Sequence, residues 1–154
     1  MLLYKKILNK LIKEHISIST AESCTGGLLA YSITKNSNSS KIYLGGHVTY
    51  SNQLKVKDLK VKKTTLKKYG AVSKEIATEM VNGLYSKYKS NICISTTGIA
   101  GPSGGTKNKP LGLVYIGIII YGKKRIFKKK FKGTRINIQK SCVNFIFNFL
   151  DKSI

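Results

Sequence analysis

The segment TAESCTGG (Thr20–Gly27) joins a short apolar, β-prone run to a segment with helical spacing, Leu28 to Ile33. A serine in such a turn projects its hydroxyl from the end of a sheet, and the first N–H groups of the helix can face an anionic group. The two glycines let a substrate approach the backbone closely. Ser23 is therefore a candidate nucleophile, although an ordinary strand-to-helix turn with Ser or Thr as N-cap has the same residue types.

Hydrophobic periodicity extends the alternation of strands and helices on both sides of this turn. The sequence predicts helices at 2–14, 25–34, 62–69, 73–89 and 136–150, a short helix from Asn52, and strands at 16–20, 41–50, 91–96, 111–121 and 125–132. The last two strands meet at Tyr121-Gly122-Lys123-Lys124, which indicates a hairpin. We therefore expect an α/β fold: a three-layer α/β/α sandwich on a mixed, mostly parallel sheet with one antiparallel hairpin.

The length of 154 residues is typical of one domain, which we expect to occupy residues 1–154. The longest apolar run, Leu113 to Tyr121, is much shorter than the roughly 18 residues of a membrane-spanning helix. The N-terminal stretch Met1 to Leu11 lacks the apolar core and cleavage site of a signal peptide. We expect no membrane contact and a cytoplasmic location.

Cysteine and histidine are too few and too scattered to suggest a metal site. Cys24, Cys93 and Cys142 are far apart and odd in number, which disfavours both a disulfide framework and a CxxC site. The only histidines are His15 and His47, so a structural zinc site is not expected. We expect no metal.

The formal net charge of +22 is typical of nucleic-acid-binding proteins, but the basic residues that supply it are not the type that such proteins favour. Lysine accounts for 26 of the 28 basic residues, and only Arg125 and Arg135 are arginine, the residue that base and phosphate recognition favours. Lysine, isoleucine and asparagine share A/T-rich codons, so a biased genome also explains the composition. We expect no specific nucleic acid, and an attraction of small anions into any cleft.

Two further segments could contribute to a site beside Ser23. The loop from Thr97 to Pro110 contains four glycines but matches neither a P-loop nor the dinucleotide fingerprint. Because it leaves a strand at the edge where α/β folds bind ligands, we interpret it as a backbone wall for an anion or oxyanion. The other segment, Tyr50-Ser51-Asn52, ends a strand and leads to Lys55 at the start of a helix.

Two activating arrangements are open for Ser23. A Ser-His-Asp triad would use His47 and Asp58. A Ser–Tyr–Lys arrangement would use Tyr50 and Lys55, since the positive end of a helix and partial burial both favour a neutral lysine. A neutral lysine can accept the serine proton, as in Ser-Lys hydrolases. The second arrangement agrees better with the sequence.

Three blocks in order resemble one known family over residues 5 to 150. They are Thr20–Gly27, then GGHVTYSN (Gly45–Asn52) with Lys55, then Gly70–Ser73 followed by TGIAGPSGGT (Thr97–Thr106) and Lys109-Pro110. In this order the chain resembles the CinA carboxy-terminal domain family, the nicotinamide-nucleotide amidases. The resemblance implies hydrolysis of nicotinamide mononucleotide to nicotinic acid mononucleotide and ammonia, in pyridine nucleotide recycling and without a cofactor.

The resemblance also implies roles for individual residues. Ser23 falls on the nucleophile, and Tyr50 and Lys55 fall on the activating residues. Substrate binding is expected of Glu22, Thr25, Gly26, Gly27, Asn52, Thr97, Gly98, Gly101, Thr106 and Arg135. The chain departs from the family pattern at Thr134, where aspartate is common, and at Gln139, where a second arginine is common.

Three alternatives remain open at this level. A catalytically silent nucleotide-binding domain would keep the same fold and pocket. A basic nucleic-acid-associated protein would use the net charge instead. A homodimer is compatible with the sequence, which gives no evidence on the oligomeric state.

Overall fold

Five strands form one mixed sheet in this computed structural model, which describes residues 2–154. Their order is β2-β1-β3-β4-β5. β1 pairs in parallel with β2 and β3, whereas β4 is antiparallel to both β3 and β5. The strands are β1 (Ile18–Glu22), β2 (Tyr43–Val48), β3 (Ile92–Gly98), β4 (Leu113–Ile120) and β5 (Lys123–Lys130). The expected mixed sheet with a terminal antiparallel hairpin is confirmed.

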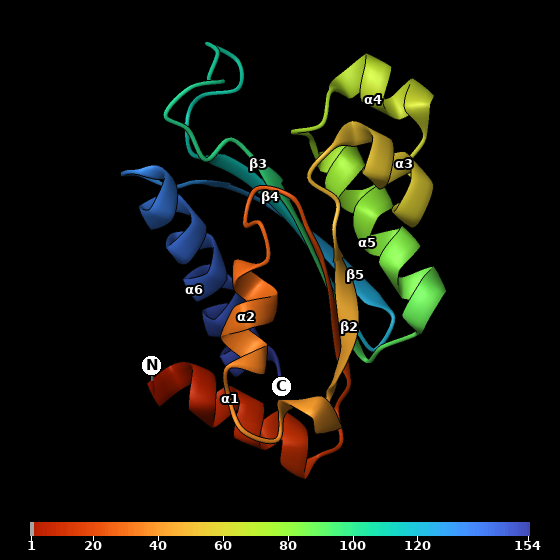
Figure 1. Cartoon of the computed structure of the whole chain (residues 1–154), viewed down its shortest axis with the longest axis vertical. Helices are drawn as coiled ribbons and strands as arrows, with labels where there is room; N and C mark the ends of the chain where they lie inside the picture. Colours follow the sequence, from red (N-terminus) through yellow and green to blue (C-terminus); the bar gives the residue numbers. More distant parts are fainter. Residues whose placement is uncertain (1) are drawn as a thin grey trace.

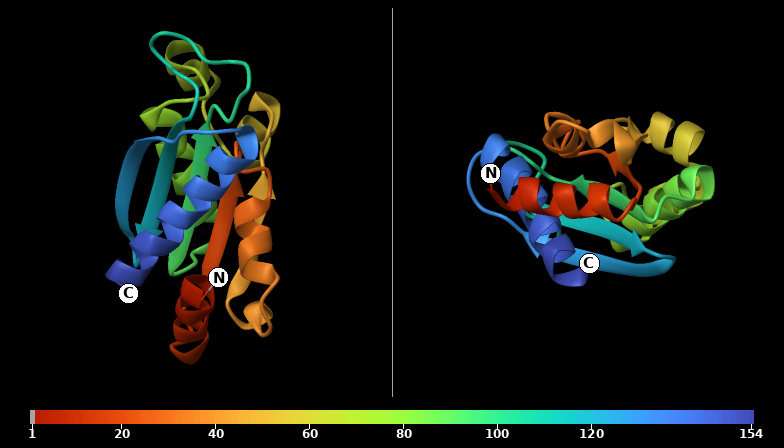
Figure 2. Two further views of the ribbon diagram at one scale, coloured as in Figure 1. Left: turned by 90° about the vertical axis from the view of Figure 1, so that its left-hand side faces the viewer. Right: turned by 90° about the horizontal axis from the view of Figure 1, so that it is seen from below.

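Helices cover both faces of this sheet (Figure 1), so the expected sandwich is confirmed as well. One layer consists of α1 (Leu2–Lys13), α2 (Leu28–Thr34) and α6 (Arg135–Ser153). The other consists of α3 (Asn52–Leu59), α4 (Lys63–Tyr69) and α5 (Lys74–Tyr88), with α5 lying directly against the sheet. A single 3-10 turn, Ser39–Lys41, leads from α2 towards β2. Figure 2 shows the same layers from two further directions.

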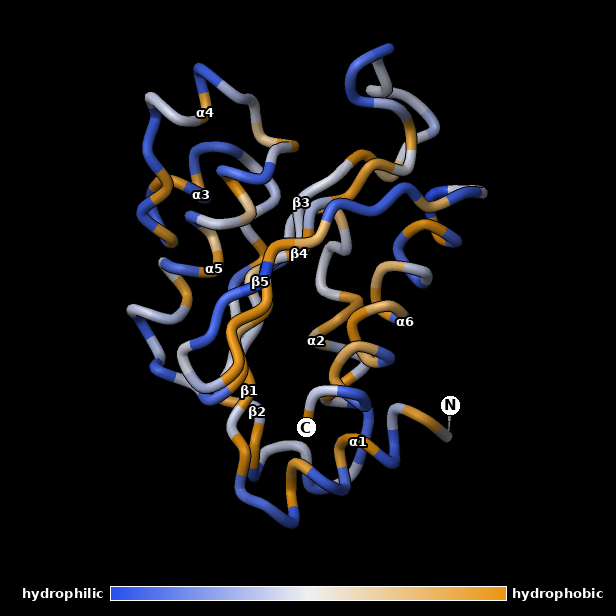
Figure 3. The backbone as a smooth tube through the Cα atoms, turned by 180° about the vertical axis from the view of Figure 1, so that it is seen from behind, coloured by the Kyte–Doolittle hydropathy of each residue, from blue (hydrophilic) through white to orange (hydrophobic). Residues whose placement is uncertain are grey.

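Each layer buries its own apolar cluster against the sheet. Successive residues of β3 point to opposite faces, so Ile92 and Ile94 join the cluster under α1, α2 and α6, whereas Cys93 joins the one under α5. The central strands are accordingly hydrophobic along much of their length (Figure 3). No helix within residues 2–154 combines the length and hydropathy needed to cross a membrane.

The Gly45-Gly46 pair allows a close backbone contact between β2 and β1. A Cβ on Gly46 would lie 2.3 Å from the Thr20 carbonyl oxygen, and the β1–β2 register shifts between Ile18 and Ser19. Only glycine allows β2 to approach β1 this closely, and this approach brings the end of β2 beside the Ser23 turn.

Most differences from the expected elements are shifts of their ends. β1 continues to Glu22 rather than ending at Thr20, and α2 begins at Leu28 rather than Thr25. Between them, Gly26 and Gly27 have φ of 57° and 100°, a left-handed conformation that interrupts the helix. The turn at Ser23 is therefore tighter and more irregular than periodicity alone predicts.

Candidate active site

Ser23 is the first residue after β1, at the edge of the sheet where both β1 and β3 end. Its N–H donates to the Thr96 carbonyl at 2.9 Å, which continues the β1–β3 pairing by one residue. The chain then turns back through Gly26 and Gly27 into α2. Ser23 is thus held by strand pairing on one side and by a helix start on the other, with 8 % of its surface exposed.

The buried carboxylate of Glu22 holds this turn together from within. It accepts hydrogen bonds from the Thr25 hydroxyl at 2.6 Å and from three backbone N–H groups, those of Gly27, Leu29 and Ala30, at 2.8 to 3.1 Å. These N–H groups lie at the start of α2, where a helix has unsatisfied donors and a partial positive charge. Glu22 therefore caps α2 although it precedes the helix by six residues.

Lys55 is the most unusual group of the site, because its side chain is 1 % exposed. The N-cap Ser51 starts α3, and Lys55 extends from the first part of that helix under the Ser23 turn. Its Nζ donates to Ser23 Oγ at 3.0 Å, to the Thr49 carbonyl at 3.0 Å and to the Tyr50 carbonyl at 3.3 Å. Burial lowers the pKa of Lys55 below its ordinary value, an effect that the nearby Cys24 thiol partly opposes.

These contacts allow Lys55 to act as a base. When the amine is neutral, two N–H groups can donate to the carbonyls of Thr49 and Tyr50. The lone pair then points at the hydroxyl of Ser23, which becomes the donor. The same three partners can also accept all three protons of the ammonium. Lys55 can therefore exchange one proton with Ser23 without losing a partner.

A cavity of about 270 Å³ opens above Ser23 and Lys55. Its walls come from the Ser23 turn, the segment between β2 and α3, the loop after β3 and the start of α6. Eight of the residues predicted from the sequence line it: Ser23, Tyr50, Asn52, Lys55, Thr97, Gly98, Gly101 and Arg135. The structure therefore brings together residues that are more than a hundred positions apart in the chain.

Five predicted substrate-binding residues do not line this cavity. Glu22 and Thr25 are buried behind the turn, where they hydrogen-bond each other. Gly26 and Gly27 form the bend into α2. Thr106 is exposed further along the loop, where its hydroxyl accepts a hydrogen bond from the N–H of Lys109. At these five positions the structure shows contacts within the turn or the loop and no share in the cavity wall.

The hydroxyl of Tyr50 is not positioned to activate Ser23. The hydroxyl lies at the rim of the cavity, where it accepts a hydrogen bond from Arg135 at 3.3 Å. The ring is 60 % exposed. Tyr50 reaches Lys55 through its backbone carbonyl instead. Its contribution to the site is therefore to orient Lys55 from below and Arg135 at the rim.

The structure does not assemble the alternative Ser-His-Asp triad. His47 Nε2 lies 2.8 Å from the Tyr88 hydroxyl, and His47 Nδ1 lies 3.8 Å from Asp58 Oδ2. Neither His47 nor Asp58 lines the cavity. His47 and Asp58 do meet, but they join β2 to α3 and α5, while Lys55 is the residue that contacts Ser23.

Several contributors to the site are not among the residues expected from the sequence. Gln139 Nε2 donates to the Cys24 carbonyl at 2.9 Å, so α6 is tied to the nucleophile turn across 115 positions. The Thr49 carbonyl holds Lys55. Ala71 and Val72 form part of the cavity wall. Both belong to the block Gly70–Ser73 that carries the family resemblance, so this block could have indicated them as site residues. Periodicity offers no signal for Gln139.

The backbone donors near Ser23 are only partly free. The Ser23 N–H is bonded to the Thr96 carbonyl, so it is not available to an oxyanion, and the Ile99 N–H is bonded to the Leu113 carbonyl. By contrast, no backbone carbonyl within residues 2–154 accepts a hydrogen bond from the N–H of Cys24 or Thr25. They are the donors that remain beside the Ser23 hydroxyl.

Cys24 is adjacent to Ser23 but is not a nucleophile candidate. It is a free, buried thiol, as are Cys93 and Cys142, and burial raises the pKa of Cys24 to about 12. The described part of the chain, residues 2–154, contains no group of three or more His, Cys, Asp or Glu side chains placed to hold a metal ion. Ser23 and Lys55 are thus the reactive pair that the cavity offers.

Comparisons with known proteins agree on one family. The model of the CinA C-terminal domain matches residues 2–154. A competence-damage inducible protein of Clostridium botulinum is 48% identical over 148 residues, which cover 96% of this chain and 36% of that protein. A CinA-like protein of Fusobacterium nucleatum is 52% identical over 136 residues, 88% of this chain and 33% of that protein. The chain thus spans about a third of the length of these curated relatives.

Solved structures show the same similarity at the level of the fold. The competence/damage inducible protein CihA from Agrobacterium tumefaciens superimposes with a TM-score of 0.92 at 34% identity, over 97% of this chain and 92% of that one. A CinA superfamily protein from Escherichia coli gives a TM-score of 0.92 at 32% identity, over 99% and 88% of the two chains.

Proposed function

The chain belongs to the CinA C-terminal domain family, and from this premise we propose that it hydrolyses the carboxamide of nicotinamide mononucleotide to nicotinic acid mononucleotide and ammonia. One observation carries the proposal: the amine of the buried Lys55 lies 3.0 Å from the hydroxyl of Ser23. Burial of a lysine against a serine at the base of a cavity supports acyl transfer through that serine.

In the first half of the proposed reaction, neutral Lys55 takes the proton of the Ser23 hydroxyl. Ser23 Oγ forms a bond to the carboxamide carbon, and the free N–H groups of Cys24 and Thr25 stabilise the oxyanion. The C–N bond then breaks. The Lys55 ammonium returns its proton to the departing nitrogen, so ammonia leaves and an acyl-enzyme remains.

The second half repeats these steps with water. Lys55 takes a proton from a water molecule, whose oxygen attacks the acyl carbon. The bond to Ser23 Oγ breaks and the proton returns to that oxygen. The nicotinate group leaves as a carboxylate, with its proton released to solvent. Lys55 is neutral again at the end of the cycle.

The 5′-phosphate of the substrate is assigned to the rim of the cavity. Arg135 is the first residue of α6, whose N-cap Thr134 accepts a hydrogen bond from the N–H of Asn137. The arginine and the start of the helix both favour an anion. Gln139, at the position where a second arginine is common in the family, is uncharged, and its amide is bonded to the Cys24 carbonyl. Arg135 therefore carries the phosphate contact in this proposal.

The test is ammonia release by the purified chain from nicotinamide mononucleotide, with the second product identified by chromatography. We expect ammonia and nicotinic acid mononucleotide in equal amounts, at a rate that a metal chelator leaves unchanged. Nicotinamide riboside, which lacks the phosphate, is the matched control and should react with a much lower kcat/KM. Ammonia release no faster than with heat-inactivated protein would refute the proposed activity and favour a silent binding domain.

A further inference from the structure

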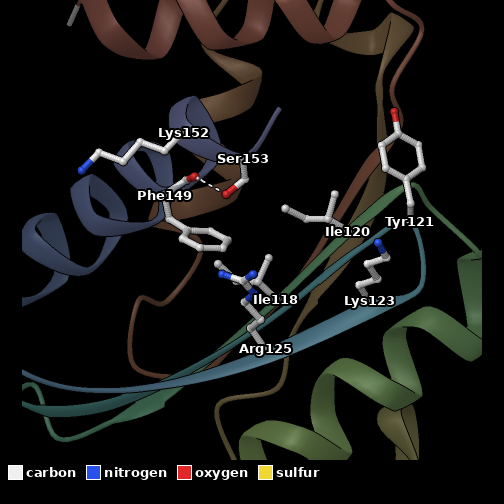
Figure 4. Close-up of a pocket in the computed structure, with 8 residues that line it drawn as sticks. All are labelled: Ile118, Ile120, Tyr121, Lys123, Arg125, Phe149, Lys152 and Ser153. Atoms are coloured by element: carbon white, nitrogen blue, oxygen red, sulfur yellow. Dashed lines mark hydrogen bonds between the residues drawn. The ribbon is translucent and has the colours of Figure 1, made fainter.

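A second cavity, of about 390 Å³, lies far from Ser23 between the β4–β5 hairpin and the last turns of α6 (Figure 4). It is at the opposite end of the sheet: Ser23 bonds to Thr96 near the end of β3, whereas Ile120 pairs with Ile92 at its start. Its lining combines apolar and cationic side chains: Ile118, Ile120, Tyr121, Lys123, Arg125, Phe149, Lys152 and Ser153.

Two cross-strand pairs make the floor of this cavity. Ile118 is directly opposite Arg125, and Ile120 is directly opposite Lys123. Residues two apart on a strand share a face, so all four side chains are on the α6 side of the sheet. The Arg125 guanidinium carbon lies 5.8 Å from the centre of the Phe149 ring, which closes the α6 side. The result is an apolar floor on β4 with two cations next to it on β5.

These two cations have no carboxylate partner. The ion pairs found within residues 2–154 involve neither Lys123 nor Arg125. Asp151, the one acid in the last turns of α6, is bound to Lys6 at 2.9 Å. The Ser153 hydroxyl donates to the Phe149 carbonyl and is satisfied, and the Lys152 ammonium points away from the floor in Figure 4. The positive charge on the floor is thus left for a ligand.

Tyr121 adds an aromatic side chain at a position that favours other residues. Tyr121 and Gly122 are the two central residues of the hairpin turn, with φ of 48° and 78°. The first position of such a turn favours Asn, Asp or Gly, since a left-handed backbone is strained for an aromatic residue. The ring is 60 % exposed and lies at the edge of the cavity. Strained residues of this kind tend to mark functional sites.

We propose that this cavity binds a small aromatic carboxylate. The carboxylate pairs with Arg125 and Lys123, whose guanidinium and ammonium groups supply charge-assisted hydrogen bonds. The ring lies on Ile118 and Ile120, against Phe149. A simple inorganic anion would leave the apolar floor exposed to water, and an uncharged ring would leave both cations unpaired. This site is independent of the reaction assigned to Ser23.

The probe is 3-phenylpropanoate, titrated calorimetrically into the wild-type chain and into two variants. Arg125→Gln should weaken binding by about tenfold or more, because a charge-assisted pair with the carboxylate is lost. Lys128→Gln is the matched control: Lys128 is exposed on the same strand but faces the other side of the sheet, so its loss should leave the affinity unchanged. 3-Phenylpropanamide, which keeps the shape without the charge, should bind about tenfold more weakly, and acetate should not saturate.

Backbone amide shifts recorded during the same titration locate the ligand. Shifts at 118–125 and 149–153, unchanged in Ser23→Ala, would support the assignment to this cavity. The proposal is overturned by any of three results: equal affinity in Arg125→Gln, equal affinity for the amide, or shifts confined to the Ser23 cavity. Lack of saturable binding by the wild-type chain in the millimolar range would overturn it as well.

Discussion

Lysine is among the residues that folding buries most reluctantly, and Lys55 is enclosed with only three neutral oxygens around its amine. Ser23, Thr49 and Tyr50 satisfy its hydrogen bonds, but within residues 2–154 no carboxylate forms an ion pair with it. A neutral amine is the form that suits such surroundings. The same feature that costs stability therefore supplies a base beside the hydroxyl of Ser23.

The first prediction concerns the pH dependence of the rate. With the pKa of Lys55 lowered by burial, amidase activity should rise with pH through an ionisation below the ordinary lysine value of 10.5. Lys55→Met should remove that ionisation and most of the turnover. Lys57→Met, on the exposed side of the same helix, is the control and should do neither. If Lys55→Met keeps the wild-type rate and profile, lysine is not the base.

The second prediction uses folding rather than activity. Between the lowered pKa of folded Lys55 and 10.5, the unfolded chain binds more protons than the folded chain. Lys55 therefore contributes more to the stability of the folded state as pH rises through that window, and less as pH falls. Urea unfolding of wild type and Lys55→Met between about pH 7 and 10 should show wild type gaining stability relative to the variant. Parallel curves for the two proteins would mean that the pKa is not lowered.

At the scale of elements, the start of α2 depends on a residue outside the helix. Glu22 is 1 % exposed and accepts one hydroxyl and three backbone hydrogen bonds. Glu22→Ala would leave these buried donors unpaired, at a cost on the order of 3 kcal/mol in the free energy of unfolding. Denaturant unfolding measures this, with the exposed Glu14→Ala as a control expected to change little. Similar stability of the two variants would show that Glu22 is not the cap of α2.

The same element shows what local sequence patterns can and cannot predict. The order strand, turn, helix followed from the residues around Ser23, because periodicity and two glycines are local signals. The start of α2 at Leu28 did not, since it depends on a carboxylate that reaches forward to Ala30. For this reason the sequence suggested that Glu22 contacts substrate, whereas in the structure its carboxylate accepts hydrogen bonds from the start of α2.

At the scale of the whole molecule, lysines are spread over the surface rather than gathered in one place. Exposed lysines occur on α1 and α6, on α4 in the opposite layer, and on the edge strand β5. Charged side chains along an edge strand also protect it from pairing with other chains. The net charge of +22 thus has no single surface to which a binding role can be assigned.

A DNA-binding experiment tests this interpretation of the charge. Any complex with duplex DNA should be non-specific, so its affinity should fall steeply with rising salt and should not depend on base sequence. Fluorescence anisotropy with two unrelated duplexes over a salt series measures both properties. A tight, sequence-selective complex at physiological salt would instead support the basic nucleic-acid-associated protein as the better account of the chain.

The site itself was predictable where its residues lie in contiguous blocks, and not where it depends on distant pairing. Eight expected residues do line one cavity, from Ser23 to Arg135. Thr106 does not, because the loop carries it away from the cavity. The bond from Gln139 to the Cys24 carbonyl joins the last helix to the first turn, and no pattern along the chain indicates such a contact.

The rate of ammonia release from nicotinamide mononucleotide by Ser23→Ala, compared with wild type, tests the central claim most directly. Removing the nucleophile should lower turnover by several orders of magnitude, since nucleophile and base act as a unit. The removed hydroxyl is small, so the circular dichroism spectrum and the melting temperature should remain close to those of wild type. A folded Ser23→Ala variant that releases ammonia at near wild-type rates would contradict the account.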